Sequence, residues 1–269
     1  MTGRKQLRIS IVTPTFNMGS FIESTILGVL IQSYSNFEHI IVDGLSTDRT
    51  LEIVGKYPHL KCVSEADTGL YNALNKGIRM ATGDIIGWCN ADDVYLPGAF
   101  HVVNDFFSVH EQIDLVYGDY REVDTLGMPI RVRREIPFSN FLFKWLHINL
   151  VPTPSAFWRR TIHEKGIWFD ETYKYANDYQ FCVDMVRKDH KILHISTLLA
   201  DFRRHPQAIS TAFVRRQNAE CEEMIRRNAG TFGNSLLYRP TRLGLLLLAR
   251  ALRTGSKTLR GCYFEHFRG

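Results

Sequence analysis

The stretch "DIIGWCNADD", residues 84–93, joins a short apolar run to a polar end. "DIIGWCN" (84–90) has the length and composition of a buried strand. Asn90, Asp92 and Asp93 follow where this strand is expected to end. Two adjacent carboxylates repel each other at neutral pH unless a cation or a proton neutralises them. The stretch therefore raises two questions: which sheet contains the strand, and what its acidic end binds.

Three more strand-like runs precede this stretch, and segments of roughly helical spacing separate them. The expected strands are "LRISIVTPTF" (7–16), "FEHIIVDG" (37–44) and "LKCVSE" (60–65), and the expected helices lie in 19–33, 51–57 and 69–81. Strands and helices that alternate with short links are typical of βαβ units. The sequence therefore predicts an α/β fold with a largely parallel central sheet.

Length and composition exclude several classes of protein. The chain has 269 residues, of which 45% are hydrophobic and 23% charged, and a net charge of +5. These values are ordinary for a globular protein and give little support to nucleic-acid binding. Its five cysteines include no C-x-x-C spacing, which argues against a zinc site or a disulfide framework. No signal peptide is recognisable, and no apolar run reaches the roughly 20 residues of a membrane span. A cytoplasmic location is expected.

Polar residues follow all four expected strands. In open parallel sheets, ligands bind beyond the carboxyl ends of the strands. The residues at these ends are Thr13, Pro14, Thr15 and Asn17; Asp43, Gly44, Ser46 and Asp48; Glu65 and Asp67; and Asn90, Asp92 and Asp93. A single Asp after a strand is often only a helix cap, and for Asp48 this interpretation is as good as a binding role. Four polar ends on one rim of a sheet are harder to explain as caps.

The paired aspartates have two interpretations. One is a solvated turn in "ADDVYLPG". The other is a site for Mg²⁺ or Mn²⁺, which is usually completed by substrate phosphates. The strand-end position favours the metal. No G-x-G-x-x-G follows the first strand and no G-x-x-x-x-G-K-[ST] occurs, which argues against a dinucleotide oxidoreductase and a P-loop NTPase.

Several motifs together resemble family 2 glycosyltransferases of the glycosyltransferase-A fold, in particular bacterial enzymes that build surface polysaccharides. The motifs are "SIVTPTFN", "IIVDGLSTDRT", "SEADTGLYNALNKGIRMATGDIIGWCNADD" and "YANDYQF". The resemblance covers roughly residues 8–210. It implies a Rossmann-like αβα sandwich that binds a nucleotide-sugar, with a catalytic domain at 1–210 and a helical, basic C-terminal extension at 211–269.

The resemblance also implies roles for single residues on the donor side. The residues expected to bind the nucleotide or the donor are Thr13, Pro14, Asn17, Asp43, Gly44, Ser46, Asp67, Asn90 and Asp92. Among these, Asp43 is expected to hydrogen-bond the uracil or its ribose. The residues expected at the metal are Asp92 and Asp93, taken jointly, and His205, which is expected to contact either the metal or the diphosphate. Asn90 departs from the family's commoner pattern, in which an Asp stands at this place.

The acceptor side is expected in the second half of the chain. "ETYKYANDYQFCVDMVRK" (171–188) resembles the family segment that contains the catalytic base, and the expected base is Asp178. From the residue alone, a helix cap is the more ordinary role for it, and the resemblance favours catalysis. Arg203 and Arg204 are expected either to neutralise diphosphate or to be solvated. Ser155, Phe157 and Trp158 belong either to the sugar or acceptor pocket or to the core.

The resemblance implies an inverting, metal-dependent transfer of a sugar from a UDP-sugar to a hydroxyl of a saccharide or lipid-linked saccharide. A sugar-phosphate nucleotidyltransferase and a non-catalytic nucleotide-sugar-binding module are the alternatives. The tail segment "RPTRLGLLLLARALRTGSKTLRG" (239–261) combines an apolar run with basic residues. It is expected either to touch an anionic membrane surface, at the inner face of the plasma membrane, or to pack on the catalytic domain.

Overall fold

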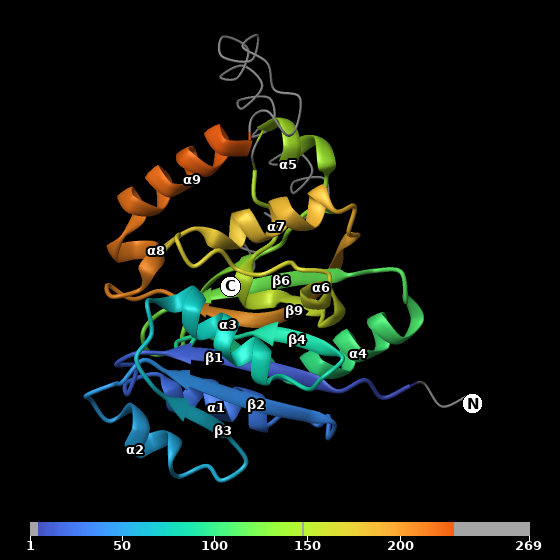
Figure 1. Cartoon of the computed structure of the whole chain (residues 1–269). Helices are drawn as coiled ribbons and strands as arrows, with labels where there is room; N and C mark the ends of the chain where they lie inside the picture. The colour runs from blue at the N-terminus through green and yellow to red at the C-terminus, as the bar shows by residue number, and fades with distance from the viewer. Residues whose placement is uncertain (1–4, 147, 229–269) are drawn as a thin grey trace.

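One mixed sheet forms the centre of the protein (Figure 1). The structure, a computed structural model, describes residues 5–146 and 148–228. In these residues the sheet has nine strands. Eight of them follow the order β3-β2-β1-β4-β8-β6-β9-β5, and the ninth, β7, pairs with β6 outside this path. The strands are β1 (Ile9–Thr15), β2 (Phe37–Asp43), β3 (Lys61–Ser64), β4 (Ile85–Trp88), β5 (Val94–Tyr95), β6 (Leu115–Val123), β7 (Pro129–Arg133), β8 (Ala156–Arg159) and β9 (Ile192–Arg203).

The first half of the sheet is the predicted parallel part. The strands β1 to β4 lie within the four expected ranges, and β1 pairs in parallel with both β2 and β4, as does β2 with β3. Thr15 is in register with Asp43, and Asp43 with Ser64. The carboxyl ends of these strands therefore meet at one edge, as expected. Beyond β4 the pairing is mixed, because β8 runs antiparallel to both β4 and β6.

Helices cover both faces of the sheet, which gives the predicted αβα sandwich. One face carries α3 (Leu70–Met80) and α7 (Asn177–Arg187), and the other carries α1 (Ile22–Leu30), α2 (Thr50–Val54) and α4 (Ala99–Val109). The remaining helices are α5 (Asn140–Leu146), α6 (Thr161–Glu164), α8 (Ile209–Ala212), α9 (Val214–Asn228) and the 3₁₀ turn η1 (Thr153–Ser155).

The alternation of side chains along β1 divides the core into two layers. Ile9 and Ile11 pack against the α1 and α4 side, whereas Val12 packs against the α3 side. Helix α3 lies so close to the sheet that a Cβ on Gly77 would stand 2.3 Å from Cγ1 of Val12. This close approach fixes the distance between α3 and the sheet. The first turn of α3 borders the site described below.

The expected C-terminal extension begins as two helices, α8 and α9. Helix α9 packs on the rest of the chain through Met224, which is fully buried. The predicted division at residue 210 stays a prediction, and the basic segment 239–261 lies outside the described residues. In the described part of the chain, no helix is long and apolar enough to cross a membrane.

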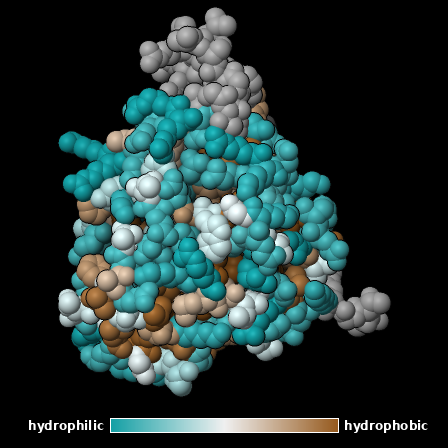
Figure 2. All heavy atoms as spheres, viewed as in Figure 1, coloured by the Kyte–Doolittle hydropathy of each residue, from teal (hydrophilic) through white to brown (hydrophobic). Residues whose placement is uncertain are grey.

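The surface seen in the orientation of Figure 1 is mostly hydrophilic, as Figure 2 shows. Hydrophobic residues gather on this face over α2 and β3, at the lower left of the view, and Leu51 of α2 is one of the exposed hydrophobic side chains. Some exposed hydrophobic surface is ordinary for a globular protein.

Candidate active site

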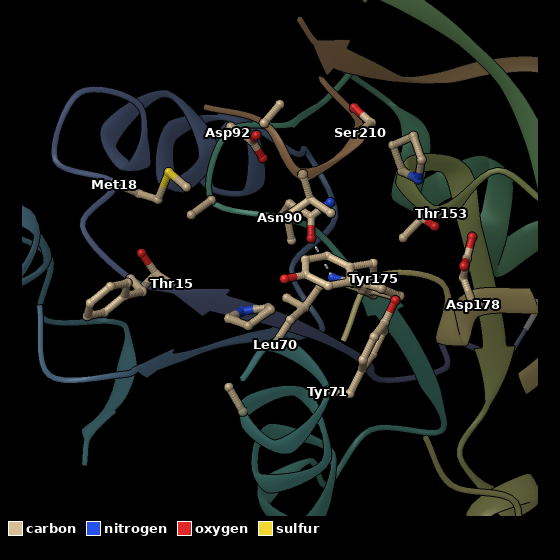
Figure 3. Close-up of a pocket in the computed structure, with 18 of the residues that line it drawn as sticks. Thr15, Met18, Leu70, Tyr71, Asn90, Asp92, Thr153, Tyr175, Asp178 and Ser210 are labelled. Atoms are coloured by element: carbon tan, nitrogen blue, oxygen red, sulfur yellow. Dashed lines mark hydrogen bonds between the residues drawn. The ribbon is translucent and has the colours of Figure 1, made fainter. Parts of the chain in front are cut away.

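A cavity of about 500 Å³ opens at the carboxyl ends of the parallel strands (Figure 3). Pro14 from the end of β1, Asn90 and Asp92 after β4, and Asp178 at the start of α7 line it. The segment after β9 contributes Gln207 and Ser210. Residues from these four separate segments thus meet at the edge where the sequence predicted a ligand.

Asn90 is held in one orientation by its neighbours. Its Oδ1 accepts a hydrogen bond from Nε1 of Trp88 at 2.8 Å, and its Nδ2 donates to Oδ2 of Asp93 at 3.0 Å. Both halves of the amide are used, and only a neutral amide can donate and accept in this way. This arrangement explains why Asn stands where an Asp is often found, since a carboxylate here could not donate to Asp93.

Asp93 points into the protein and not into the cavity. Its exposed fraction is 1%, and it is not among the residues that line the cavity. Besides Asn90, the backbone N–H of Arg203 donates to its Oδ1 at 3.1 Å. Burial, together with the nearby charge of Asp92, raises the pKa of Asp93 well above its usual value. The structure therefore does not bring Asp93 to the predicted metal position.

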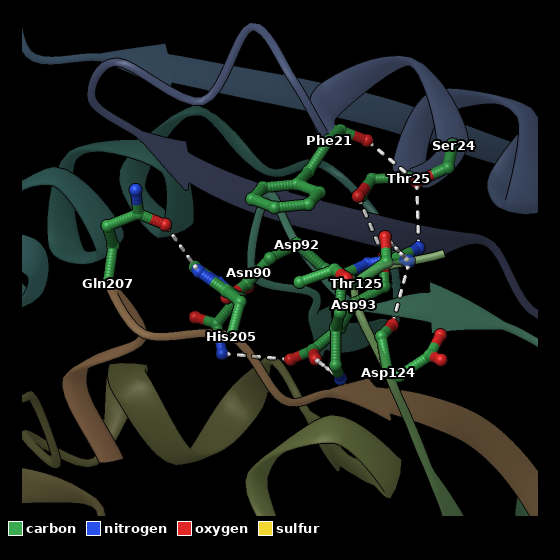
Figure 4. A network of polar contacts seen from close by, with 11 residues as sticks. Phe21, Ser24, Thr25, Asn90, Asp92, Asp93, Asp124, Thr125, His205 and Gln207 are labelled. Carbon is green, nitrogen blue, oxygen red and sulfur yellow. Dashed lines mark hydrogen bonds and ion pairs between the residues drawn. The ribbon is translucent and has the colours of Figure 1, made fainter. Parts of the chain in front are cut away.

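Asp92 lies on the cavity wall and is paired with His205 (Figure 4). Its Oδ2 lies 2.9 Å from Nε2 of His205, whose Nδ1 lies 3.2 Å from Oε1 of Gln207. The hydrogen bond to Asp92 raises the pKa of His205. The His205 side chain is buried and its ring lies 4.6 Å from that of Phe21. The structure thus brings together Asp92 and His205, two of the residues that were expected at the metal.

The Asp92–His205 pair has the donor set and spacing of two metal ligands. Mg²⁺ holds its ligands at about 2.0–2.1 Å, so two ligands on adjacent corners of an octahedron are about 2.9 Å apart. The hydrogen bond to the Asp92 carboxylate needs a proton on Nε2, and a cation bound here would replace that proton. His205 would then keep its proton on Nδ1, directed at Oε1 of Gln207, which is how ligating histidines are usually oriented. In the described residues no three His, Cys, Asp or Glu side chains form a metal cluster. A cation here would need further oxygen ligands from a substrate.

Neither Arg203 nor Arg204 lines the cavity. Arg203 is buried, and its Nε donates to the carbonyl oxygen of Asp92 at 2.9 Å, while its other nitrogens donate to the carbonyl oxygens of Asp124 and Thr125 and to Oγ of Ser24. Arg203 thus has a structural role, in which it ties the end of β9 to the turn after β4. Arg204 donates to Glu122 at 3.0 Å, and 35% of its side chain is exposed.

The ends of β1 and β2 are joined to each other outside the cavity. Oδ1 of Asn17 accepts from the N–H of Thr47 at 2.8 Å, and Oγ of Ser46 accepts from the N–H of Asn17 at 2.8 Å. Asp43 is fully buried and accepts from the N–H of Ser46 at 3.0 Å and from Oγ of Ser64 at 2.7 Å. Their predicted contacts with the nucleotide stay predictions, and in this structure these residues shape the loops around the site.

Thr13, Asp48 and Asp67 have different surroundings. Oγ1 of Thr13 pairs with Nε2 of the buried His39 at 2.9 Å, away from the cavity. Asp48 accepts from the N–H of Thr50 at 2.9 Å and from that of Gly19 at 2.9 Å, so it supports the turn before α2, whose N-cap residue is Arg49. Asp67 lines the cavity and lies against Gly44, where an added Cβ would stand 2.5 Å from its Oδ2.

Asp178 stands on the cavity wall in the first turn of α7. Nδ2 of Asn149 donates to its Oδ2 at 3.2 Å. Burial raises the pKa of Asp178 to about 6, although the amide groups at the start of the helix oppose this shift. A carboxylate with such a pKa is well matched to accept a proton near neutral pH.

The sequence analysis missed several aromatic residues of the cavity. Its wall includes Tyr71, Trp88, Tyr120, Tyr175 and Phe202. Tyr71 and Trp88 lie within "SEADTGLYNALNKGIRMATGDIIGWCNADD", Tyr175 lies within "YANDYQF" and Phe202 directly precedes Arg203, but no role in the site was expected for any of them. Aromatic faces of this kind are common walls for ligands with apolar surfaces. Tyr71 and Trp88 stand in a predicted helix and a predicted strand, where an aromatic side chain indicates core packing first, and Tyr120 lies outside the predicted elements.

The residues of "VPTPSAFWRR" (151–160) divide between cavity and core. Pro152, Thr153 and Pro154 line the cavity. Phe157 and Trp158 are buried in the hydrophobic core, and Oγ of Ser155 donates to the carbonyl oxygen of Gly118 at 2.8 Å. The core interpretation thus holds for the three residues considered, and their neighbours form the wall.

Comparisons with known proteins identify the family. The model of "Glycosyl transferase family 2" matches residues 10–167, which is more than half of the chain. The chain therefore belongs to glycosyl transferase family 2, and by family it is a glycosyltransferase, as the sequence motifs predicted.

Among curated proteins, an uncharacterized glycosyltransferase of Rickettsia prowazekii is 29% identical over 198 residues, which cover 69% of this chain and 62% of that protein. A PGL/p-HBAD biosynthesis glycosyltransferase of Mycobacterium bovis is 37% identical over 116 residues, which cover 41% and 45% of the two chains. The chain thus spans less than two thirds of the length of these relatives.

Solved structures share the fold. Staphylococcus aureus TarS 1–349 in complex with UDP-GlcNAc is similar with a TM-score of 0.63 and 22% identity, over 76% of this chain and 61% of that one. The mannosyltransferase PcManGT of Pyrobaculum calidifontis, in complex with GDP-Man and Mn²⁺, has a TM-score of 0.61 and 17% identity over 92% and 70% of the chains. The likeness confirms the glycosyltransferase-A fold expected from the sequence.

Proposed function

We propose that this chain is an inverting, metal-dependent glycosyltransferase. It moves a sugar from a UDP-sugar to a hydroxyl group of a saccharide or of a lipid-linked saccharide. One observation carries the proposal: Asp92, which pairs with the buried His205, and Asp178, whose pKa is raised, line one cavity at the carboxyl ends of the parallel strands. Asp92 and His205 would hold a metal ion for the diphosphate, and Asp178 would act as a base.

On the donor side, Asp92 and His205 would hold Mg²⁺ or Mn²⁺, and Arg203, which donates to the carbonyl oxygen of Asp92, would keep Asp92 in place. The metal ion, when bound, stabilises the negative charge that grows on the departing diphosphate. The family membership and the Mn²⁺ in the PcManGT complex support this choice of cofactor. The choice of uridine rests on the resemblance and agrees with the UDP-GlcNAc bound to TarS.

On the acceptor side, Asp178 accepts the proton of the attacking hydroxyl. Asn149 orients the carboxylate through its contact with Oδ2, which leaves Oδ1 for the acceptor. The hydroxyl attacks the anomeric carbon from the face opposite the leaving diphosphate, so a single displacement inverts the configuration. Because a diphosphate is stable as an anion, no carboxylic acid is needed to protonate it as it leaves, in contrast to the leaving group in a glycosidase.

The roles in the cell follow from the resemblance. We place the reaction in the biosynthesis of a bacterial surface polysaccharide, on the cytoplasmic side of the plasma membrane, with the basic segment 239–261 as a peripheral contact. The mycobacterial relative, which is named for PGL/p-HBAD biosynthesis, is consistent with a role in building surface glycans or glycolipids.

The alternative functions predict different products. A sugar-phosphate nucleotidyltransferase would form pyrophosphate from a nucleoside triphosphate and a sugar phosphate. A non-catalytic module would bind the nucleotide-sugar and leave it intact, and it would have no use for a base such as Asp178.

The test is a nucleotide-release assay on a panel of UDP-, GDP- and TDP-sugars with Mn²⁺, with Mg²⁺ or with EDTA. We expect metal-dependent release of UDP from one donor, and loss of this release in Asp178→Asn while calorimetric binding of UDP with Mn²⁺ is kept. Lack of UDP binding with either metal would overturn the proposal. Release of pyrophosphate instead of UDP would favour the nucleotidyltransferase.

A further inference from the structure

The carboxylate of Glu220 receives three consecutive backbone N–H groups from a distant loop. Oε1 of this α9 residue accepts from Lys174 at 2.9 Å, and Oε2 accepts from Tyr175 at 2.7 Å and from Ala176 at 3.1 Å. Hydrogen bonds from N–H groups to a carboxylate are about twice as strong as those between neutral groups. Glu220 therefore holds this loop by its main chain, and the loop does not depend on its own side chains for this contact.

The loop held by Glu220 leads directly into the proposed catalytic base. It places the side chain of Tyr175 on the cavity wall (Figure 3), and two residues later α7 begins with Asn177. Asp178 follows in the first turn of that helix. Any displacement of residues 174–176 would therefore move Tyr175 and the start of the helix that bears Asp178.

Helix α7 lacks a cap of its own, which explains why a remote carboxylate is needed. Its N-cap residue is Ala176, whose side chain offers no acceptor. The first N–H groups of a helix have no partner within the helix and need one elsewhere. Glu220 supplies it for Ala176, and the hydroxyl of Tyr71 supplies it for Asn177 at 2.9 Å. A negative charge at this end also suits the helix dipole.

The rest of α9 reinforces this contact. Nε2 of Gln217 donates to the carbonyl oxygen of Tyr175 at 3.0 Å, and a guanidinium nitrogen of Arg216 donates to the Tyr175 hydroxyl at 3.1 Å. Gln217 also lines the cavity. The predicted C-terminal extension thus supplies part of the wall and anchors one segment of the site.

We propose that Glu220 is a positioning residue for the transfer reaction, and that it fixes Tyr175 and the start of α7 so that Asp178 meets the acceptor. This inference rests on the proposed function. It assigns Glu220 to the catalytic step and not to donor binding, because the Asp92–His205 pair stands on other elements, the turn after β4 and the segment after β9. The expected signature is a lower kcat with an unchanged KM for the donor.

The experiment compares Glu220→Gln with the matched control Glu222→Gln. Glu222 lies two residues further along the same helix and is exposed, so its replacement changes the net charge equally without touching the loop. Three quantities are measured: hydrogen exchange of the amides of residues 174–176, calorimetric binding of UDP with Mn²⁺, and kcat and KM for UDP release from the donor found in the panel above.

For Glu220→Gln we expect exchange of these amides to accelerate about tenfold or more, since their protection reports local opening. We expect kcat to fall at least tenfold, with the KM for the donor and the UDP affinity within twofold of the values of the Glu222→Gln control. A fall in UDP affinity in parallel with kcat would overturn the assignment, because it would indicate a general loss of structure. Unchanged amide exchange or unchanged kcat would overturn it as well.

Failure of the proposed function has a different signature. If the wild-type chain binds no UDP with Mn²⁺ and releases none from any donor, the transferase proposal falls and the catalytic role of Glu220 falls with it. If the wild-type chain is active and Glu220→Gln matches the control, only the inference about Glu220 is overturned.

Discussion

The carboxylate of Asp92 and the imidazole of His205 lie 2.9 Å apart, although 113 residues separate them in the sequence. Two contacts bring them together. Strand β5 pairs with β9 next to Asp92, and the buried Arg203 holds the carbonyl oxygen of Asp92 through its Nε. The end of β9 is thus fastened to the turn after β4, and the polar pair forms where these two segments meet.

If Asp92 and His205 hold a metal ion together, replacing either residue should weaken the binding of UDP that depends on this ion. Asp92→Asn and His205→Gln should each weaken the binding of UDP in the presence of Mn²⁺ by about tenfold or more, the range found when metal-site partners are removed. The double variant should lose less than the sum of the two effects, because both side chains serve one ion. Calorimetry with and without EDTA measures this. Equal UDP binding by the wild type in Mn²⁺ and in EDTA would contradict it.

Asn90→Asp should destabilise the protein even though it restores the family's commoner residue. The change removes the donor to Oδ2 of Asp93 and adds a second carboxylate beside a buried one. We expect a loss of about 2–4 kcal/mol in the free energy of unfolding at pH 7, which is typical of a buried polar contact turned into a repulsive one. Urea unfolding measures it, with Asn218→Asp on the exposed surface of α9 as the control.

The loss in Asn90→Asp should shrink as the pH falls toward 5. A proton on either carboxyl group removes the repulsion and restores a donor, so the folded state of the variant binds protons more tightly than the unfolded state. A penalty that stays constant between pH 5 and pH 8 would contradict this account.

Asp178 predicts the pH dependence of activity. Because burial raises its pKa to about 6, kcat/KM should rise as the pH increases through about 6 and should level off above it, where the base is ionised. The rate of UDP release between pH 5 and pH 8.5 measures this profile. Asp178→Asn should lose the rise together with nearly all of the activity, and retained activity in this variant would exclude Asp178 as the base.

The same raised pKa predicts that Asp178→Asn stabilises the fold. The protonated carboxyl is favoured in the folded state, so its contribution is fully present below the unfolded pKa and is lost as the pH rises through about 6. Above that pH the ionised group costs about 1–3 kcal/mol, at 1.36 kcal/mol per pKa unit and allowing for its partial exposure. Thermal unfolding at pH 8 should show the variant to be more stable than the wild type, with little difference at pH 4.

Gly77→Ala tests the close approach of α3 to the sheet. Alanine is the better helix former by about 1 kcal/mol, but its Cβ would stand 2.3 Å from Cγ1 of Val12. We expect overpacking to dominate, with a net loss of about 1–2 kcal/mol in the free energy of unfolding. Val12→Ala in the same chain should relieve part of this loss, so that the two changes together cost less than their sum. A more stable Gly77→Ala chain would contradict the prediction.

The first half of the fold could be predicted from the sequence because its signals are local. The strands β1 to β4 are short apolar runs, and the helices between them have helical spacing, so each element is specified by adjacent residues. The second half could not be predicted in this way. Strand β8 enters between β4 and β6 with antiparallel pairing, which depends on contacts between residues far apart in the sequence.

In the candidate site, too, only the features that depend on adjacent residues could be suggested from the sequence. Adjacency suggested that Asp92 and Asp93 act together, but neighbouring residues point in different directions, and only Asp92 faces the cavity. The partnership of Asp92 with His205 was expected from the family resemblance, since no local pattern connects them. The contacts of Glu220 and the structural role of Arg203 escaped the sequence analysis altogether, because both residues bind backbone groups, which leave no trace in residue identity.

Glu220 binds the loop 174–176 only through N–H groups, which every residue except proline provides. Side chains in this loop can therefore be exchanged without loss of these three hydrogen bonds, although a change at Tyr175 would also remove the hydrogen bond that Arg216 donates to its hydroxyl. The loop can therefore tolerate substitutions. A change at Tyr175 alters the side chain that one wall of the cavity presents to a ligand, while the backbone hydrogen bonds to Glu220 still hold the residues that lead to Asp178. New acceptor preferences could thus arise by single substitutions, without any need to rebuild the catalytic geometry.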